Sequence, residues 1–201
     1  SWEPTTVEPS RRGVAETMAA AVPGPDGLVA VGPVDSGAEA DAVIWHHADG
    51  EWRQSRPEAM AGDHEQWASD VAVGKSGMVV AGGENAWGET RPRVWFSADG
   101  EAWASVDGGP GGPFDGPGIE SVRSVAAWGP GFVAVGSRTI DNDQDAAVWF
   151  SPDGESWEAI DEPGLGGEGR QGLLTVAVVG TVVVAGGFVN DAAGQGKPVA
   201  W

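Results

Sequence analysis

The stretch Ser151-Pro152-Asp153-Gly154-Glu155-Ser156-Trp157 decides the fold of this chain. A close copy lies at 97–103, and a shorter copy without the Ser lies at 47–52. Each copy follows an apolar run that contains Trp. Because Asp and Gly tolerate the positive φ of a tight turn, an apolar run, Asp-Gly and a second aromatic run predict a β-hairpin. The three copies therefore predict recurring hairpins.

These hairpins belong to an internal repeat of about 50 residues, the period of a four-stranded unit in several repeat folds. Four Val- and Ala-rich runs end in glycines at this spacing: Gly32, Gly82, Gly136 and Gly186. Tryptophans form two further registers with the same period: Trp45, Trp95, Trp149 and Trp201, and then Trp2, Trp52, Trp103 and Trp157. Four short strands per repeat are typical of a β-propeller blade.

We therefore predict an all-β fold, a β-propeller of four-stranded antiparallel blades that forms one domain over residues 1–201. The repeats span about 2–52, 52–103, 103–157 and 157–201. Trp2 matches the start of a fourth strand and Trp201 matches a third strand. The N-terminal strand is thus expected to close the last blade without an exposed edge. Half of an eight-bladed ring formed by a dimer, or a piece of a larger propeller, are the alternatives.

The composition limits the partners of the chain. A formal net charge of −19 would repel phosphate backbones, so nucleic acid is not expected as a partner. No apolar run reaches the roughly 18 residues of a membrane span. The chain has no cysteine, which excludes disulfides and thiolate chemistry. The chain starts at Ser1, which we interpret as a processed or trimmed N-terminus. With the acidity, these features fit a secreted or cell-surface protein.

The stretches at 97–103 and 151–157 resemble the Asp-box (BNR-type) repeat of sialidase-like propellers, with one residue fewer between Asp and Trp. The resemblance implies that the box is a structural turn between the third and fourth strands. It implies that Asp99 and Asp153 accept hydrogen bonds from their own turns, and that Trp103 and Trp157 pack inward. Sialidase-like chemistry needs a Tyr nucleophile, and the chain contains no Tyr. That mechanism is therefore excluded.

Candidate binding residues lie in the segments that differ between repeats. We expect long loops between the second and third strands, near 33–41, 84–92, 137–145 and 187–197, and before each first strand, near 53–65, 105–118 and 159–169. Loops that vary on a constant frame carry specificity. The predicted ligand-binding residues on this face are Trp87, Glu84, Asn85, Arg138 and Phe188.

A possible metal site lies in Asp141-Asn142-Asp143-Gln144-Asp145. Alternating carboxylates can supply a hard cation with oxygen ligands, so Asp141, Asp143 and Asp145 are candidate calcium ligands. The run lacks the Gly and the distal Glu of a helix-loop-helix site. A solvated acidic loop is the alternative.

For function we favour a non-enzymatic binding or scaffold propeller outside the cytoplasm that recognises a protein or a glycan. The first alternative is a glycoside-active enzyme with carboxylates in the central funnel. The candidate acids near the starts of the first strands are Glu16, Glu65, Glu120 and Glu168. The second alternative is a structural module of a larger surface assembly, and a homo-oligomer is also compatible with the sequence. A pair of acids in an accessible pocket would favour the enzyme.

Overall fold

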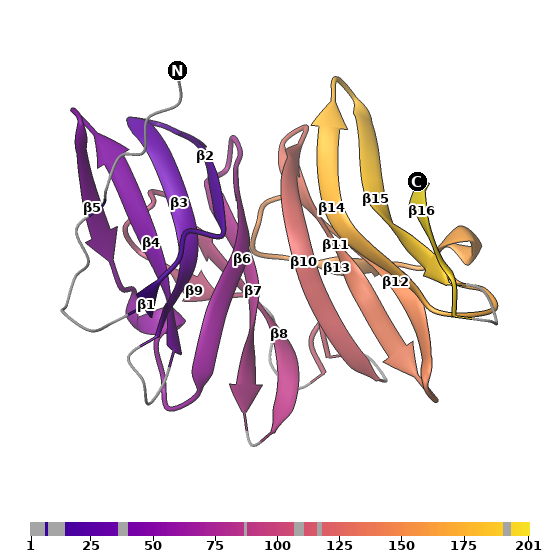
Figure 1. Ribbon diagram of the computed structural model, residues 1–201. Coiled ribbons are helices and arrows are strands. Elements are labelled where there is room, and N and C mark those ends of the chain that lie inside the picture. The colour runs from indigo at the N-terminus through magenta and orange to yellow at the C-terminus, as the bar shows by residue number, and fades with distance from the viewer. Residues whose placement is uncertain are drawn as a thin grey trace.

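The computed structural model describes residues 7, 15–35, 40–86, 88–106, 111–115, 118–190 and 194–201, without the side chains at 119 and 120. Four antiparallel sheets follow one another along this part of the chain. Figure 1 shows them side by side, from indigo to yellow. Sheet A contains β1 (Ala15–Glu16), β2 (Ala20–Gly24), β3 (Gly27–Asp35), β4 (Ala40–Ala48) and β5 (Glu51–Ser55). Sheet B contains β6 (Glu65–Val73), β7 (Met78–Ala86), β8 (Glu89–Ser97) and β9 (Ala104–Ser105).

Sheet C contains β10 (Ile119–Trp128), β11 (Gly131–Ile140), β12 (Asp143–Ser151) and β13 (Glu158–Ile160). Sheet D contains β14 (Gln171–Val179), β15 (Val182–Asn190) and β16 (Gly196–Ala200). The 3₁₀ helices η1 (Glu58–Met60) and η2 (Pro163–Leu165) precede β6 and β14. The all-β class is confirmed. No helix among the described residues has the length and apolarity that crossing a membrane requires.

The Asp-Gly turns have the geometry that the resemblance implies. The Asp153 Oδ1 atom accepts hydrogen bonds from the backbone N–H groups of Glu155 and Ser156, at 2.9 and 2.8 Å. Asp99 accepts the equivalent pair from Glu101 and Ala102, both at 2.9 Å. These backbone donors hold the pKa of each carboxyl below its usual value. The shorter copy differs, because Asp49 and Gly50 both have positive φ and join β4 and β5 directly.

The first strands of sheets B, C and D carry a bulge at the same place. Register shifts lie between Ala68 and Asp70, between Val122 and Ser124, and between Leu173 and Thr175. Beside each bulge, and at the matching place in sheet A, a glycine of the second strand approaches the backbone so closely that any Cβ would meet a carbonyl oxygen of the first strand. These glycines are Gly32, Gly82, Gly136 and Gly187. The fourth member of the glycine register is therefore Gly187, and the prediction of Gly186 is wrong by one residue.

Neighbouring sheets pack through buried apolar interfaces, each of which is termed a seam. In the A–B seam, the connection before β6 inserts Met60 beneath Trp95, whose indole N–H donates to the carbonyl of Ala59 at 2.7 Å. The B–C and C–D seams repeat this arrangement. There Trp149 and Trp201 donate to Pro113 and Gly164, at 2.9 Å each, next to the buried Phe114 and Leu165. We name Met60, Phe114 and Leu165 the plug residues.

The connections between the second and third strands are shorter than expected. β7 runs to Ala86 and β8 begins at Glu89, while β11 runs to Ile140 and β12 begins at Asp143. The strands extend this far because cross-strand pairing continues to the last residue of each hairpin. The prediction of long loops at 84–92 and 137–145 is therefore wrong. Among the fully described connections, those before β6 and β14 are long, at 56–64 and 161–170.

The sheets form an open row in the described part of the chain. The first strands of neighbouring sheets pack against each other, whereas β14–β16 make no comparable contact with β1–β5. Sheets A and D lie at opposite ends of the row in Figure 1. The expected pairing of Trp2 beside Trp201 lies outside the described residues. Four closed blades are therefore not confirmed, and sheet D has three strands in the described part.

Candidate functional site at the axis of the sheets

The axis is formed by the inner strands β2, β6, β10 and β14, which lie next to one another. Below the bulges they line a cavity of about 600 Å³, within the size range of ligand pockets. Its lining is Val22, Pro23, Asp70, Val71, Ala72, Val73, Ser124, Val125, Ala126, Ala127, Thr175, Val176 and Val178. All four strands contribute residues from their C-terminal halves. Their N-terminal ends therefore share the opposite end of the axis, which we term the mouth.

The cavity contains one carboxylate among its lining residues, and its oxygens are occupied. The Asp70 Oδ2 atom accepts from the hydroxyl of Ser124 at 2.6 Å and from the N–H of Val125 at 3.0 Å. Its Oδ1 atom accepts from the N–H of Val71 at 2.9 Å. The Ser124 hydroxyl in turn accepts from the N–H of Val176 at 3.2 Å. Asp70 therefore ties β6 to β10, and this cavity offers no pair of free acids.

The mouth gathers more polar groups. Glu65 is exposed at the start of β6 and accepts a hydrogen bond from Asn85 at 3.4 Å. On the next strands Glu84 pairs with Arg93, with 3.5 Å between Oε2 and Nε. Of the other candidate acids, Glu16 begins sheet A, the backbone of Glu120 pairs with Arg138, and Glu168 is exposed before β14. Glu65 is therefore the candidate acid whose described side chain lies at this end of the axis.

A small groove at the mouth contains Trp67, which the sequence interpretation missed. The ring lies against Gly83, where a Cβ would clash with it, and the groove continues along β10 to Arg123. The groove is lined by Trp67, Gly82, Gly83, Thr90, Arg91, Pro92, Ser121, Val122 and Arg123. Six other described tryptophans donate their indole N–H to backbone carbonyls: Trp95, Trp103, Trp128, Trp149, Trp157 and Trp201. Trp67 shows no such bond among the described residues, and it lies outside both tryptophan registers.

Apart from Trp87, the predicted ligand-binding residues lie on three neighbouring sheets, each opposite the N-terminal end of a first strand. Glu84 and Asn85 are at the mouth, and Trp87 lies outside the described residues. Arg138 is in β11 opposite Asp145, and its Nε atom is buried without a hydrogen bond in the described part of the chain. Phe188 is in β15, with its ring packed over Gly172.

The acidic run at 141–145 forms a tight hairpin. Asp141 and Asn142 have positive φ and make the turn between β11 and β12, while Asp143 and Asp145 are strand residues. Asp145 accepts a hydrogen bond from the N–H of Gly167 at 3.4 Å. Among the described residues, no three His, Cys, Asp or Glu side chains come together as metal ligands. This geometry gives the calcium prediction no support.

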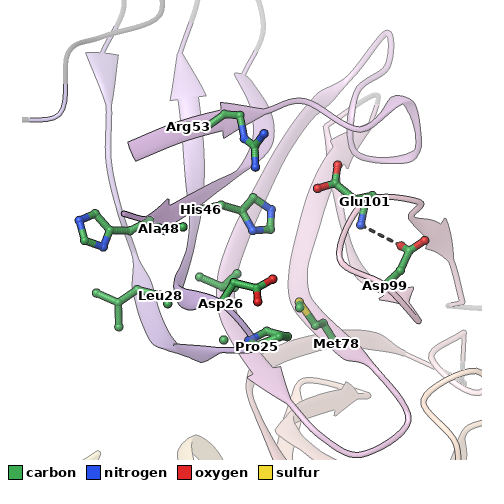
Figure 2. A pocket seen from close by; sticks show the side chains of 13 residues that line it. Pro25, Asp26, Leu28, His46, Ala48, Arg53, Met78, Asp99 and Glu101 are labelled. Atoms are coloured by element: carbon green, nitrogen blue, oxygen red, sulfur yellow. Dashed lines mark hydrogen bonds between the residues drawn. The ribbon is translucent and has the colours of Figure 1, made fainter. Parts of the chain in front are cut away.

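A second polar pocket lies in the A–B seam at the end of the Asp-Gly turns (Figure 2). His46 lies in it between Met78 and the turn at Gly100, with Glu101 and Arg53 near by. Burial lowers the pKa of His46, Glu101 raises it, and Arg53 lowers it further. In the next seam Phe96 packs against Gly154 in the same way. His46 therefore occupies a packing position that is held by an apolar Phe in the next sheet.

The fold is similar to that of solved glycosidase propellers. A candidate glycosidase from Bacteroides thetaiotaomicron matches with a TM-score of 0.55 at 14% identity, over 92% of this chain and 67% of that protein. A candidate glycoside hydrolase from Parabacteroides distasonis matches with a TM-score of 0.54 at 12% identity, over 92% and 67%. A third similar structure is described with the GH130 family of mannoside phosphorylases, which contains glycoside hydrolases that target β-1,2 mannosidic linkages in Candida mannan. It matches with a TM-score of 0.53 at 12% identity, over 92% of this chain and 65% of that chain.

The chain thus spans about two thirds of the length of these proteins. No protein-family model matches it, and no curated protein matches its sequence. At this identity the likeness shows the fold alone, a β-propeller fold, as the resemblance to sialidase-like propellers implied. The preference for a non-enzymatic binding or scaffold propeller is corrected, because the similar propellers are described as glycoside-active proteins. They favour the enzyme alternative.

Proposed function

We propose that this chain is the propeller of a glycoside-active enzyme that binds its carbohydrate at the mouth of the axis. The observation that supports it is the fold likeness to candidate glycosidases over 92% of the chain. In this proposal sheets A–D are successive blades, and the turns at 97–103 and 151–157 are Asp-box turns at the end away from the sugar.

The groove at Trp67 has a volume of about 30 Å³, so in this proposal a sugar ring contacts its rim and does not enter it. A partly buried indole can stack on the apolar face of a pyranose and keep its N–H free for a hydroxyl. Arg123 is exposed at the bulge of β10 and lines the same groove. Its guanidinium donors are suited to sugar oxygens. A net charge of −19 opposes polyanionic glycans, so the proposed substrate is neutral.

Cleavage of a glycosidic bond needs a carboxylic acid that protonates the leaving oxygen, usually with a second carboxylate on the other side of the bond. Glu65 is two residues from Trp67 on the same strand and is the first candidate for the acid. Glu16 and Glu168 are the candidates for the second carboxylate. A phosphorylase would use inorganic phosphate as the nucleophile in place of a second protein group.

The test is turnover of neutral oligosaccharides, with β-1,2-mannobiose first, with and without inorganic phosphate, followed by chromatography of the products. Glu65→Gln should lower kcat at least about 100-fold, the usual contribution of a general acid. Trp67→Ala should raise KM. Glu155→Gln, in the Asp-Gly turn of sheet C, is the matched control and should match the parent. No turnover of any neutral glycan, or equal loss in the control, would overturn the proposal.

A further inference from the structure

Asp-Gly peptides join the third and fourth strands of sheets A, B and C, at Asp49, Asp99 and Asp153. Such a peptide can rearrange, because the nitrogen of a residue without a side chain is open to attack the neighbouring Asp carboxyl group. The N–Cγ bond forms, and the carboxyl hydroxyl leaves with the N–H proton as water, which gives a five-membered succinimide ring. Water then opens the ring at the main-chain carbonyl, so the chain runs through Cγ as isoaspartate. A further described Asp-Gly peptide, at Asp26, has its glycine inside β3, where strand pairing with Gly24 restrains it.

In the turns of sheets B and C the nitrogen that would attack is held by a hydrogen bond. The Ser97 hydroxyl accepts from the N–H of Gly100 at 2.8 Å, and the Ser151 hydroxyl accepts from the N–H of Gly154 at 2.7 Å. Both glycines are also buried, with side chains of the neighbouring seam packed against them. The nitrogen of each turn is therefore restrained from moving toward the carboxyl carbon.

The carboxylates of the same two turns are held as well. Asp99 and Asp153 each accept two backbone N–H groups of their own turn, and Figure 2 shows the bond from Glu101 to Asp99. The ring closes on the protonated carboxyl group, because the departing oxygen leaves as water. The turn N–H groups lower the pKa of both carboxyls, so the protonated form is rarer at neutral pH.

The turn in sheet A lacks these restraints. Asp49 and Gly50 form the whole two-residue turn, with φ of 54° and 82°, between the paired residues Ala48 and Glu51. His47 stands where the other two turns have Ser. Both turn residues are exposed, and a Cβ on Gly50 would meet no atom within 4 Å. Within the described part of the chain, neither the Asp49 side chain nor the Gly50 N–H makes a hydrogen bond.

We infer that Asp49-Gly50 is a site of spontaneous isoaspartate formation in the folded protein, whereas the turns at Asp99 and Asp153 are protected. Isoaspartate adds one atom to the main chain of a two-residue turn. Because turn type and loop length fix the register of a hairpin, the pairing of β5 with β4 is then weakened. The protein should therefore lose stability at the outer edge of sheet A as it ages.

The test is incubation of the chain at neutral pH and physiological temperature for several weeks, followed by tryptic digestion and mass spectrometry. Cleavage at Arg53 and Arg138 places the three turns in separate peptides, and electron-transfer fragmentation distinguishes isoaspartate from aspartate at each position. Asp49 should convert about tenfold faster than Asp99 or Asp153, the effect of one lost hydrogen bond.

A sample unfolded in guanidinium chloride is the control for sequence, and there the three peptides should convert at similar rates. Asp49→Glu is the control for the site, because its longer side chain cannot form the five-membered ring. The aged parent should melt at a lower temperature than the fresh parent, while aged Asp49→Glu should match its own fresh sample. Equal rates at the three turns of the folded protein, the same preference in the unfolded chain, or an aged parent as stable as a fresh one would overturn the inference. None of these measurements depends on the proposed activity.

Discussion

His46 is a residue at which one repeat departs from the next. The following sheets have Phe96 and Phe150 at this position, and Phe96 packs against Gly154 as His46 packs against Gly100. The Nε2 atom of His46 is buried without a hydrogen bond in the described part of the chain. The seam therefore accommodates an imidazole where an apolar ring would suffice.

We expect His46→Phe to stabilise the protein by about 0.5–2 kcal/mol, as other substitutions toward a repeat consensus do. Burial lowers the pKa of His46 below 6.5, so the unfolded chain binds the proton more readily. The stability of the parent should therefore fall as pH decreases through 6.5 toward the folded-state pKa. Melting temperatures of parent and variant between pH 5 and pH 8 measure this difference.

The control for this experiment is His47→Phe, which retains His46 and contacts Trp52 at 4.9 Å between ring centroids. It should keep the pH dependence of the parent. An unchanged pH profile in His46→Phe would show that His46 does not couple protonation to folding.

Asp153 is a residue whose structural role was predicted. Asp153→Ala removes the acceptor of two backbone N–H groups and should lower the free energy of unfolding by about 1 kcal/mol, since the turn is exposed. Its folded-state pKa is lowered, so this stabilisation is present above the usual carboxyl pKa and is lost as pH falls through the folded value. Urea unfolding at neutral pH and near pH 3 measures it.

The exposed Asp161 provides the comparison, because Asp161→Ala should leave stability within about 0.5 kcal/mol of the parent. If Asp153→Ala were as stable as Asp161→Ala at neutral pH, the turn would not depend on its carboxylate.

Among the elements, the strands and the Asp-Gly hairpins were predictable because their residues recur. The plug residues were not, since Met60, Phe114 and Leu165 share only apolarity and lie in connections that differ in sequence. Their spacing of 35 or 36 residues before Trp95, Trp149 and Trp201 was the available signal. Trp67 was missed for a related reason, because sequence alone cannot show that Gly83 leaves room beside it. The lengths of the connections between second and third strands were predicted wrongly, because polar residues at 84–92 were interpreted as loop.

Substitution of Phe114 tests whether the plug residues stabilise the seams. Its ring centroid lies 5.2 Å from that of Trp149 and 5.6 Å from that of Trp157, in the core of the B–C seam. Phe114→Ala should cost about 3–5 kcal/mol through the cavity it leaves. Phe114→Leu should recover most of this loss. Chemical unfolding measures both, and a cost below about 1 kcal/mol for the Ala variant would show that the connection is not part of the core.

The net charge of −19 affects the stability of the whole molecule. Self-repulsion of this size opposes the compact state, and salt screens it, with the Debye length falling from about 30 Å at 0.01 M to about 8 Å at 0.15 M. We expect the melting temperature to rise with NaCl over this range. A melting temperature that stays constant or falls would show that the acidic groups do not limit stability.

The same measurement tests calcium, which stays a prediction. At matched ionic strength, a specific site would make CaCl₂ raise the melting temperature more than NaCl or MgCl₂. Asp143→Asn combined with Asp145→Asn would then abolish the excess. Equal effects of the three salts would leave the hairpin at Asp141 without a metal role.

The plug residues also define where one unit of this protein ends and another begins. Met60 follows sheet A in the sequence but is buried with sheet B, and Phe114 and Leu165 are shifted forward in the same manner. A gene segment that begins just before a plug residue and ends after the fourth strand encodes one sheet together with the plug residue that packs it against the preceding sheet. Adding or removing such a segment would leave the other seams intact. Such a segment is therefore the natural unit for a change in the number of sheets, as a single repeat is in other repeat proteins.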